Sequence, residues 1–226
     1  MSVTFPRAHL HTLSPPTTTA QNLGHHRLPS NKFLLYDHSM RIPMLFKGPG
    51  IAQNTESDFL GTQVDLAPTI LGFAGIATPS YVDGKSLVPL LVSGGDHDEL
   101  LGATRDHLRT ELLNAPMMSR DASFLEYYNQ GPWEVGSTHA LDDWSNTYIG
   151  LYVRSKTFGN WKYGEFDPYG KQSNFTSVYM TELFNLDADP WEKYNVINAS
   201  NTSAALKEYL HTTVRAYYEC VGVNCM

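Results

Sequence analysis

The feature that most constrains the fold is a series of four short strand-like runs in the second half of the chain. They are rich in aromatic and β-branched residues, and Gly, Pro, Asn and Asp separate them. This composition is typical of strands joined by turns. We therefore expect four antiparallel strands, over residues 123–128, 146–153, 160–166 and 181–186.

A helix is expected after these strands. Residues 203–219 place apolar side chains at helical spacing, which would make one face of the helix apolar. Asn201 or Thr202 can cap its start, and the helix would cover one face of the sheet. The apolar positions are Leu206, Tyr209 or Leu210, Thr213 or Val214, and Tyr217.

The first half of the chain predicts two further elements. Residues 42–46 are an apolar run before a Gly-Pro-Gly turn, and they predict a short buried strand suited to a parallel sheet. Residues 65–75 predict a short helix, because Asp65 can cap its start and Pro68 is tolerated in a first turn. Residues 1–20 lack the apolar core of a secretory signal and predict a disordered or linker-like segment.

The composition limits the possible partners. The chain has 226 residues, of which 42% are hydrophobic and 17% are charged, as in globular proteins. Its net charge of -7 argues against broad binding to nucleic acid or to an anionic membrane. No apolar run reaches the ~18 residues of a transmembrane helix, so no membrane-spanning segment is predicted.

Other patterns favour a secretory origin. Three Asn-x-Ser/Thr sequons begin at Asn174, Asn198 and Asn201, and each would be a surface glycan site in the secretory pathway. Cys220 and Cys225 are the only cysteines. They either close a small terminal loop by a disulfide or remain two thiols.

Residues 23–51 carry the most specific pattern. A basic set, which consists of His25, His26, Arg27 and Lys32, precedes the apolar run. This segment resembles the sulfatase family, in which a Lys, then a Tyr and an acid, an Arg-apolar-Pro strand and a Gly-Pro-Gly turn begin the C-terminal half of the catalytic domain. The corresponding positions here are Lys32, Tyr36, Asp37, Arg41, Pro43, Gly48, Pro49 and Gly50.

Two further segments are similar to the same family. Residues 83–91 resemble the pattern that closes the large domain, and residues 182–196 resemble the last strand with the Asp-Pro turn after it. The Asp-Pro pair predicts a turn on physical grounds as well, and Glu192 and Asn195 can hydrogen-bond the exposed backbone there.

The resemblance implies an α/β fold. It would consist of the C-terminal part of an alkaline-phosphatase-like sulfatase domain plus a small four-stranded antiparallel sheet with a C-terminal helix. Residues 1–22 would then be disordered or non-homologous, residues 23–95 the C-terminal part of the catalytic domain, and residues 123–226 the antiparallel-sheet subdomain.

The catalytic parts of the family have no counterpart in this sequence. Sulfatases use a formylglycine made from the Cys of a Cys-x-Pro-Ser-Arg motif, and neither cysteine here lies in that motif. Where the family has a calcium-binding Asp-Asn-Gly triplet, this chain has Thr18, Thr19 and Ala20, whose neutral hydroxyls cannot replace a carboxylate. The resemblance therefore predicts no catalytic residue, no calcium bound by this chain alone, and an N-terminal catalytic half as a missing partner.

The remaining candidates would bind substrate. The family counterpart of Lys32 reaches the sulfate oxygens, which suits an ammonium group, and the alternative is a surface lysine in a loop. His26 corresponds to a family histidine that contacts substrate or supports Lys32, and the alternative is a structural histidine. A further cluster combines aromatic and polar side chains and consists of residues 127–133, His139 and residues 142–144. It could bind sugar rings, but aromatic residues that anchor the small subdomain are the favoured explanation.

The function that the resemblance implies is hydrolysis of sulfuric esters in sulfated glycans or aryl sulfates, as in the glucosamine-6-sulfatase and arylsulfatase branch. The chain alone is predicted to be inactive. Two alternatives stay open: a non-catalytic module that binds sulfated glycans, and a phosphate or phosphonate ester hydrolase of the same superfamily. The family and the sequons imply a secreted or lysosomal protein, although the sequence shows no signal peptide.

Overall fold

The computed structural model describes residues 24–28, 34–48, 51–92, 120–128, 144–168, 174–222 and 225. These residues form two compact units. Within the described residues, unit 1 contains 43–48, 51–92, 120, 221–222 and 225, and unit 2 contains 24–28, 34–42, 121–128, 144–168 and 174–220. This division groups the described residues 24–28 and 34–42 with the sheet, and the domain boundaries expected from the sequence stay a prediction.

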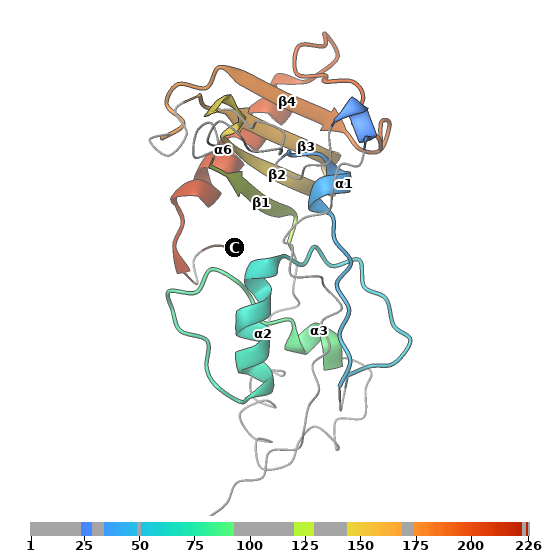
Figure 1. Ribbon diagram of the computed structural model, residues 1–226, viewed down its shortest axis with the longest axis vertical. Coiled ribbons are helices and arrows are strands. Elements are labelled where there is room, and N and C mark those ends of the chain that lie inside the picture. Colours follow the sequence, from blue (N-terminus) through green and yellow to red (C-terminus); the bar gives the residue numbers. More distant parts are fainter. Residues whose placement is uncertain are drawn as a thin grey trace, which may run out of the picture. The chain divides into compact units, whose positions relative to one another are not determined.

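Unit 2 is built on a four-stranded antiparallel sheet (Figure 1). Each strand pairs with the next one along the chain. The four predicted strands are confirmed, with ends shifted by one or two residues. They are β1 (Ala122–Tyr127), β2 (Tyr148–Ser155), β3 (Gly159–Phe166) and β4 (Met180–Asn185).

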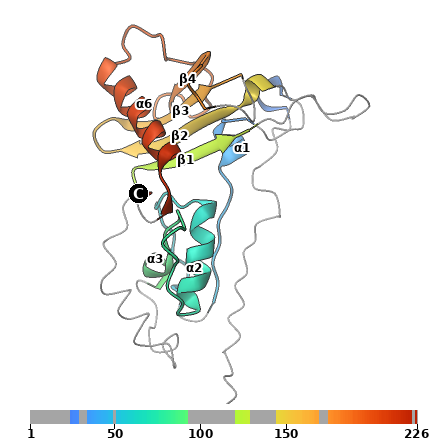
Figure 2. The same cartoon turned by 90° about the vertical axis from the view of Figure 1, so that its left-hand side faces the viewer.

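Helix α6 (Ala204–Glu219) covers one face of this sheet, as predicted, and Figure 2 shows it crossing the strands. Its cap is Ser203, whose Oγ accepts a hydrogen bond from the Leu206 amide at 3.1 Å, so the prediction of Asn201 or Thr202 as cap is wrong. The core between helix and sheet contains Ile149, Leu151, Val153, Tyr163, Leu183, Leu206, Leu210 and Val214. Alternate residues of a strand point to the same face of a sheet, so Ile149, Leu151 and Val153 of β2 face this core together.

Polar contacts add to this core. Glu165 on β3 is buried, and its carboxylate accepts hydrogen bonds from Tyr163 Oη at 2.7 Å and from Arg215 on α6 at 2.5 Å. His211 Nδ1 on the same helix lies 2.6 Å from Glu165 Oε1. A buried carboxylate needs such partners, and here they join the helix to the sheet.

The opposite face of the sheet holds a segment from far earlier in the chain. Leu35 is buried there against Tyr148 and Phe166. Gly150 and Gly164 are register partners on β2 and β3, and a Cβ at Gly150 would lie 2.7 Å from Leu35 Cδ1. The two glycines leave the space that Leu35 fills. Directly after Leu35 and Tyr36, the chain forms the short helix α1 (Asp37–Met40).

Unit 1 contains η2 (Gln63–Asp65), α2 (Leu66–Phe73) and α3 (Val88–Val92). The helix predicted over residues 65–75 is confirmed. Asp65 does not cap α2 with its side chain. Its carboxylate is buried, forms a bidentate ion pair with Arg120 at 2.6 and 2.9 Å, and accepts the Lys85 amide at 2.8 Å.

The prediction of a buried strand over residues 42–46 is wrong. Those residues have no strand assignment, and Leu45 is 52% exposed. An apolar run becomes a strand only when a neighbouring strand pairs with its backbone, and the described part of unit 1 contains no strand. Among the described residues, no helix is long and apolar enough to cross a bilayer.

Candidate functional site

The structure describes one of the two predicted substrate-binding residues. His26 lies in η1 (His25–Arg27), whereas Lys32 lies outside the described residues. Three backbone hydrogen bonds close the η1 turn, including Leu28 N to His25 O at 2.9 Å. His26 and Arg27 have φ angles of 53° and 61°, which is the left-handed region that non-glycine residues rarely adopt.

This tight turn presents basic side chains to solvent. His25, His26 and Arg27 are all exposed. Together they can donate hydrogen bonds to the oxygens of an anion, as imidazolium and guanidinium groups do. The turn therefore has the chemistry of an anion contact.

His26 belongs to a stack of four aromatic rings. The His26 ring lies 4.5 Å from the Tyr36 ring at an interplanar angle of 12°, and 5.4 Å from the His38 ring. His25 stacks on His38 at 4.9 Å. We call His25, His26, Tyr36 and His38 the ring stack. Burial lowers the pKa of His38, the neighbouring His25 and His26 add to that effect, and Asp37 opposes it.

Two buried charged residues, one on β3 and one in the turn after β4, hold the segment that carries Tyr36 and His38. Lys162, on β3, is fully buried, and its Nζ donates to the Leu35 carbonyl at 3.2 Å and to Asp37 Oδ1 at 3.3 Å. Glu192 is also buried, and its Oε2 accepts the Asp37 amide at 2.6 Å. Its Oε1 lies 3.8 Å from Lys162 Nζ.

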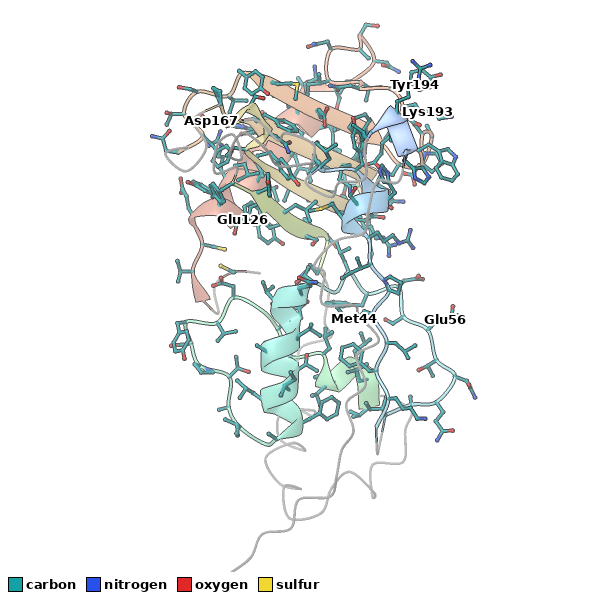
Figure 3. The ribbon with its side chains drawn as sticks, in the orientation of Figure 1. Met44, Glu56, Glu126, Asp167, Lys193 and Tyr194 are labelled. Atoms are coloured by element: carbon teal, nitrogen blue, oxygen red, sulfur yellow. The ribbon has the colours of Figure 1, made fainter. Side chains whose placement is uncertain are left out.

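Glu192 was expected to bind exposed backbone near its own turn, and that expectation is wrong. Its carboxylate accepts the amide of Asp37, which lies 155 residues away in sequence. Asp189 stabilises the turn instead and accepts the amides of Lys193 and Tyr194, whose side chains are labelled in Figure 3. The Asn195 side chain bonds backbone on β4 rather than at the turn: its Oδ1 accepts the Leu183 amide and its Nδ2 donates to the Thr181 carbonyl.

Burial and like charge perturb the ionisable groups on this face. Burial raises the pKa of Tyr36 to about 12, and the charges of Glu182 and Glu192 add to the effect. Burial, followed by the charge of Glu192, raises the pKa of Glu182 to about 7. Burial lowers the pKa of Lys162, and the carboxylates of Glu192 and Asp37 oppose that change. These groups are held in an environment that disfavours charge.

Sequence reasoning missed Lys162, although one signal was present. A charged side chain on a strand that is covered on both faces has no contact with solvent. A lysine between Trp161 and Tyr163, in the middle of an aromatic strand, is therefore unusual. Such a lysine must find buried partners. The partners themselves could not be identified from the sequence.

The described residues do not fit a calcium site. Within the described ranges, no group of three or more His, Cys, Asp or Glu residues could hold a metal ion. Thr18, Thr19 and Ala20, which stand at the family's calcium-binding triplet, lie outside those ranges.

The structure also describes the two cysteines, the three sequon asparagines and part of the aromatic cluster. Both Cys220 and Cys225 are disulfide-bonded. Asn174, Asn198 and Asn201 are all exposed. Tyr127 packs beside Tyr148 at 5.9 Å and Tyr128 beside Phe175 at 6.2 Å, whereas residues 129–143 lie outside the described ranges.

Comparison with known proteins gives the family. Residues 24–108 match the C-terminal region of N-sulphoglucosamine sulphohydrolase. The N-acetylglucosamine-6-sulfatase of Bos taurus is 28% identical over 218 residues, which cover 89% of this chain and 33% of that protein. Arylsulfatase K of Rattus norvegicus is 30% identical over 165 residues, which cover 73% of this chain and 23% of that protein. The chain thus spans about a third or less of the length of these relatives.

Solved structures show the same fold. One was solved in complex with its substrate D-glucosamine-2-N,6-O-disulfate. The two chains superpose with a TM-score of 0.61 at 22% identity, over 88% of this chain and 32% of that chain. A second, a 2-O GAG sulfatase, has a TM-score of 0.58 and 24% identity and covers 88% of this chain and 34% of that chain. In sequence and in fold, this chain matches the C-terminal part of sulfatases.

Proposed function

We propose that this chain supplies part of the substrate-binding site of a sulfatase, with His26 and Lys32 as contacts to the sulfate group. The observation that carries this proposal is the exposed basic turn of η1, held by the ring stack on a sheet of the sulfatase fold. Imidazole and ammonium groups suit a sulfate because both donate hydrogen bonds to its oxygens.

Sulfated glucosamine is the favoured ligand class. Curated relatives that cover 89% of this chain are named N-acetylglucosamine-6-sulfatases, and a structural neighbour was solved with a disulfated glucosamine as its substrate. Aryl sulfates are the second class, since arylsulfatases are also among the relatives.

We further propose that these 226 residues alone bind the sulfate ester without hydrolysing it. The sequence has no Cys-x-Pro-Ser-Arg motif. The nucleophile and the calcium ligands would then have to come from other sequence, namely an N-terminal catalytic half. Sequencing the transcript upstream of the codon for Met1 tests this point directly, because an open frame that encodes the motif is expected there.

Isothermal titration with D-glucosamine-2-N,6-O-disulfate tests the binding. We expect weak, salt-sensitive binding by the full chain, because surface ion pairs are screened by salt. His26→Ala and Lys32→Ala should each weaken it. Lys156→Ala, at an exposed position in the turn between β2 and β3, is a control and should not. Equal affinity in all three variants would contradict the proposed site.

The same titration separates the alternatives. If glucosamine 6-phosphate binds more tightly than the sulfated sugar, the alternative function as a phosphate ester hydrolase is favoured. If a complete transcript lacks the catalytic motif while binding persists, the chain acts as a non-catalytic glycan-binding module. Titration with Ca²⁺ alone should give no binding, in line with the donor set of the described residues.

We propose that the protein is secreted or lysosomal and glycosylated at Asn174, Asn198 and Asn201. All three side chains are exposed, as glycan acceptors must be, and one relative is named an extracellular sulfatase. When the chain is expressed through a secretory pathway, a glycosidase that removes N-linked glycans should increase its mobility on a gel. Replacing each Asn by Gln in turn should remove one step of that shift.

A further inference from the structure

We propose that Lys162 and Glu192 are positioning residues for the sulfate-binding site, acting through residues 35–38. Neither is expected to touch the ligand, because both are buried within unit 2. The inference rests on the proposed function, since it concerns the same site. Three observations support it.

The first observation concerns the hydrogen-bond partners of the buried Lys162 ammonium group. A buried ammonium must replace water by protein partners, and the two hydrogen bonds of Nζ both go to residues 35 and 37. The Tyr152 ring lies 5.1 Å from Nζ on the same face and supplies a cation–π contact. Both hydrogen bonds of Lys162 thus hold the segment that contains Leu35 and Asp37.

The second observation is that Glu192 binds the same segment. Its Oε2 accepts the Asp37 amide at 2.6 Å, while its Oε1 faces Lys162 Nζ at 3.8 Å. Asp37 is therefore bound twice, through its amide by Glu192 and through its carboxylate by Lys162. A residue bound through both groups has little freedom to rotate or slide along the sheet.

The third observation links this segment to the η1 turn. Tyr36 lies between the two bound residues, Leu35 and Asp37, and its ring stacks on His26 at 4.5 Å. His38 follows Asp37 and stacks on both His25 and His26. Movement of residues 35–38 would therefore move the surface on which His26 rests. In this way Lys162 and Glu192 set the position of a group they do not contact.

The matched control lies on the same strand. Glu165 is three residues after Lys162 on β3, is equally buried, and is bound by Arg215 and Tyr163 on the opposite face of the sheet. Glu165→Gln should lower the stability of unit 2 as Lys162→Met does. It touches none of residues 35–38 in the contacts described above, so it should leave the ring stack unchanged.

The experiment compares the full chain with Lys162→Met, Glu192→Gln and Glu165→Gln. Two readouts are needed: the NMR signals of the His25, His26 and His38 rings in the free protein, and the affinity for D-glucosamine-2-N,6-O-disulfate. Lys162→Met should shift the ring signals and weaken binding about tenfold, the loss expected when one charge-assisted hydrogen bond is misplaced. Glu192→Gln should have a smaller effect of the same kind, since its amide oxygen can still accept the Asp37 amide.

Each outcome decides the inference. It is supported if Lys162→Met changes rings and affinity while Glu165→Gln, at a comparable loss of thermal stability, changes neither. It is overturned if Lys162→Met leaves the ring signals in place, or if both variants weaken binding equally. Should Lys162→Met fail to fold, Glu192→Gln carries the comparison. If the full chain does not bind the sugar, the proposed function fails, and the ring signals still decide whether Lys162 positions His26.

Discussion

Glu182 should make the stability of unit 2 depend on pH. It lies on β4 opposite Gly164, and burial together with the charge of Glu192 raises its pKa from 4.5 to about 7. The folded protein then holds this proton more tightly than the unfolded chain does. The stabilisation is fully present below about pH 4.5 and is lost as the pH rises through about 7.

The size of the effect follows from these two values. The difference between 4.5 and about 7, at about 1.4 kcal/mol per pH unit, gives at most about 3 kcal/mol in the free energy of unfolding. Partial exposure of Glu182 lowers the effect below this limit. Burial raises the pKa of Glu192 as well, with Lys162 in opposition, so any contribution from Glu192 has the same sign.

Urea unfolding at about pH 4.5 and about pH 7.5 measures this dependence. The wild-type chain should lose stability between the two pH values. Glu182→Gln cannot ionise, so its loss should be smaller by up to about 3 kcal/mol. Glu208→Gln, at an exposed position of α6, serves as control and should follow the wild type. Parallel curves for wild type and Glu182→Gln would refute the reasoning.

Three further substitutions test the packing. Asp65→Ala leaves the buried Arg120 without its carboxylate and should cost about 3–5 kcal/mol in unit 1, measured by thermal unfolding. Ser203→Ala removes the side-chain cap of α6 and should cost about 1 kcal/mol, measured by urea unfolding. Gly84→Ala places a Cβ against the Val64 carbonyl and should cost about 1–3 kcal/mol, again measured by thermal unfolding.

Controls for the first two are available on the surface. Glu56→Ala removes an exposed carboxylate and Ser177→Ala an exposed hydroxyl, and each should alter stability by less than about 0.5 kcal/mol. If Asp65→Ala were no worse than Glu56→Ala, the ion pair with Arg120 would not be important for unit 1. If Ser203→Ala matched Ser177→Ala, the cap would contribute nothing measurable.

The sheet and its helix could be predicted from the sequence because their signals are local. Aromatic and β-branched runs between turn residues indicate strands, and the helical spacing of Leu206, Leu210 and Val214 indicates the buried face of α6. Residues 42–46 carry an equally apolar signal, yet they form no strand. Whether an apolar run becomes a strand depends on pairing with other parts of the chain, which the run itself does not reveal.

The candidate site could be predicted only in part. The basic turn was visible because His25, His26 and Arg27 are adjacent. The support beneath it was not, since Lys162 and Glu192 reach residues far away in sequence. Glu192 in particular has the local context of a turn residue, and only the folded chain shows that its carboxylate binds the Asp37 amide.

The docking of residues 35–37 on the sheet has a consequence for the order of folding. Its hydrogen bonds to Lys162 and Glu192 join residues 125 to 155 positions apart. Contacts of such long range form slowly, and they need the strands to be in register first, because Leu35 fits only where Gly150 faces Gly164. The segment should therefore be the last part of unit 2 to dock and the first to detach. The Asp37 amide, protected from hydrogen exchange only while docked, would report that local opening well before the sheet itself unfolds.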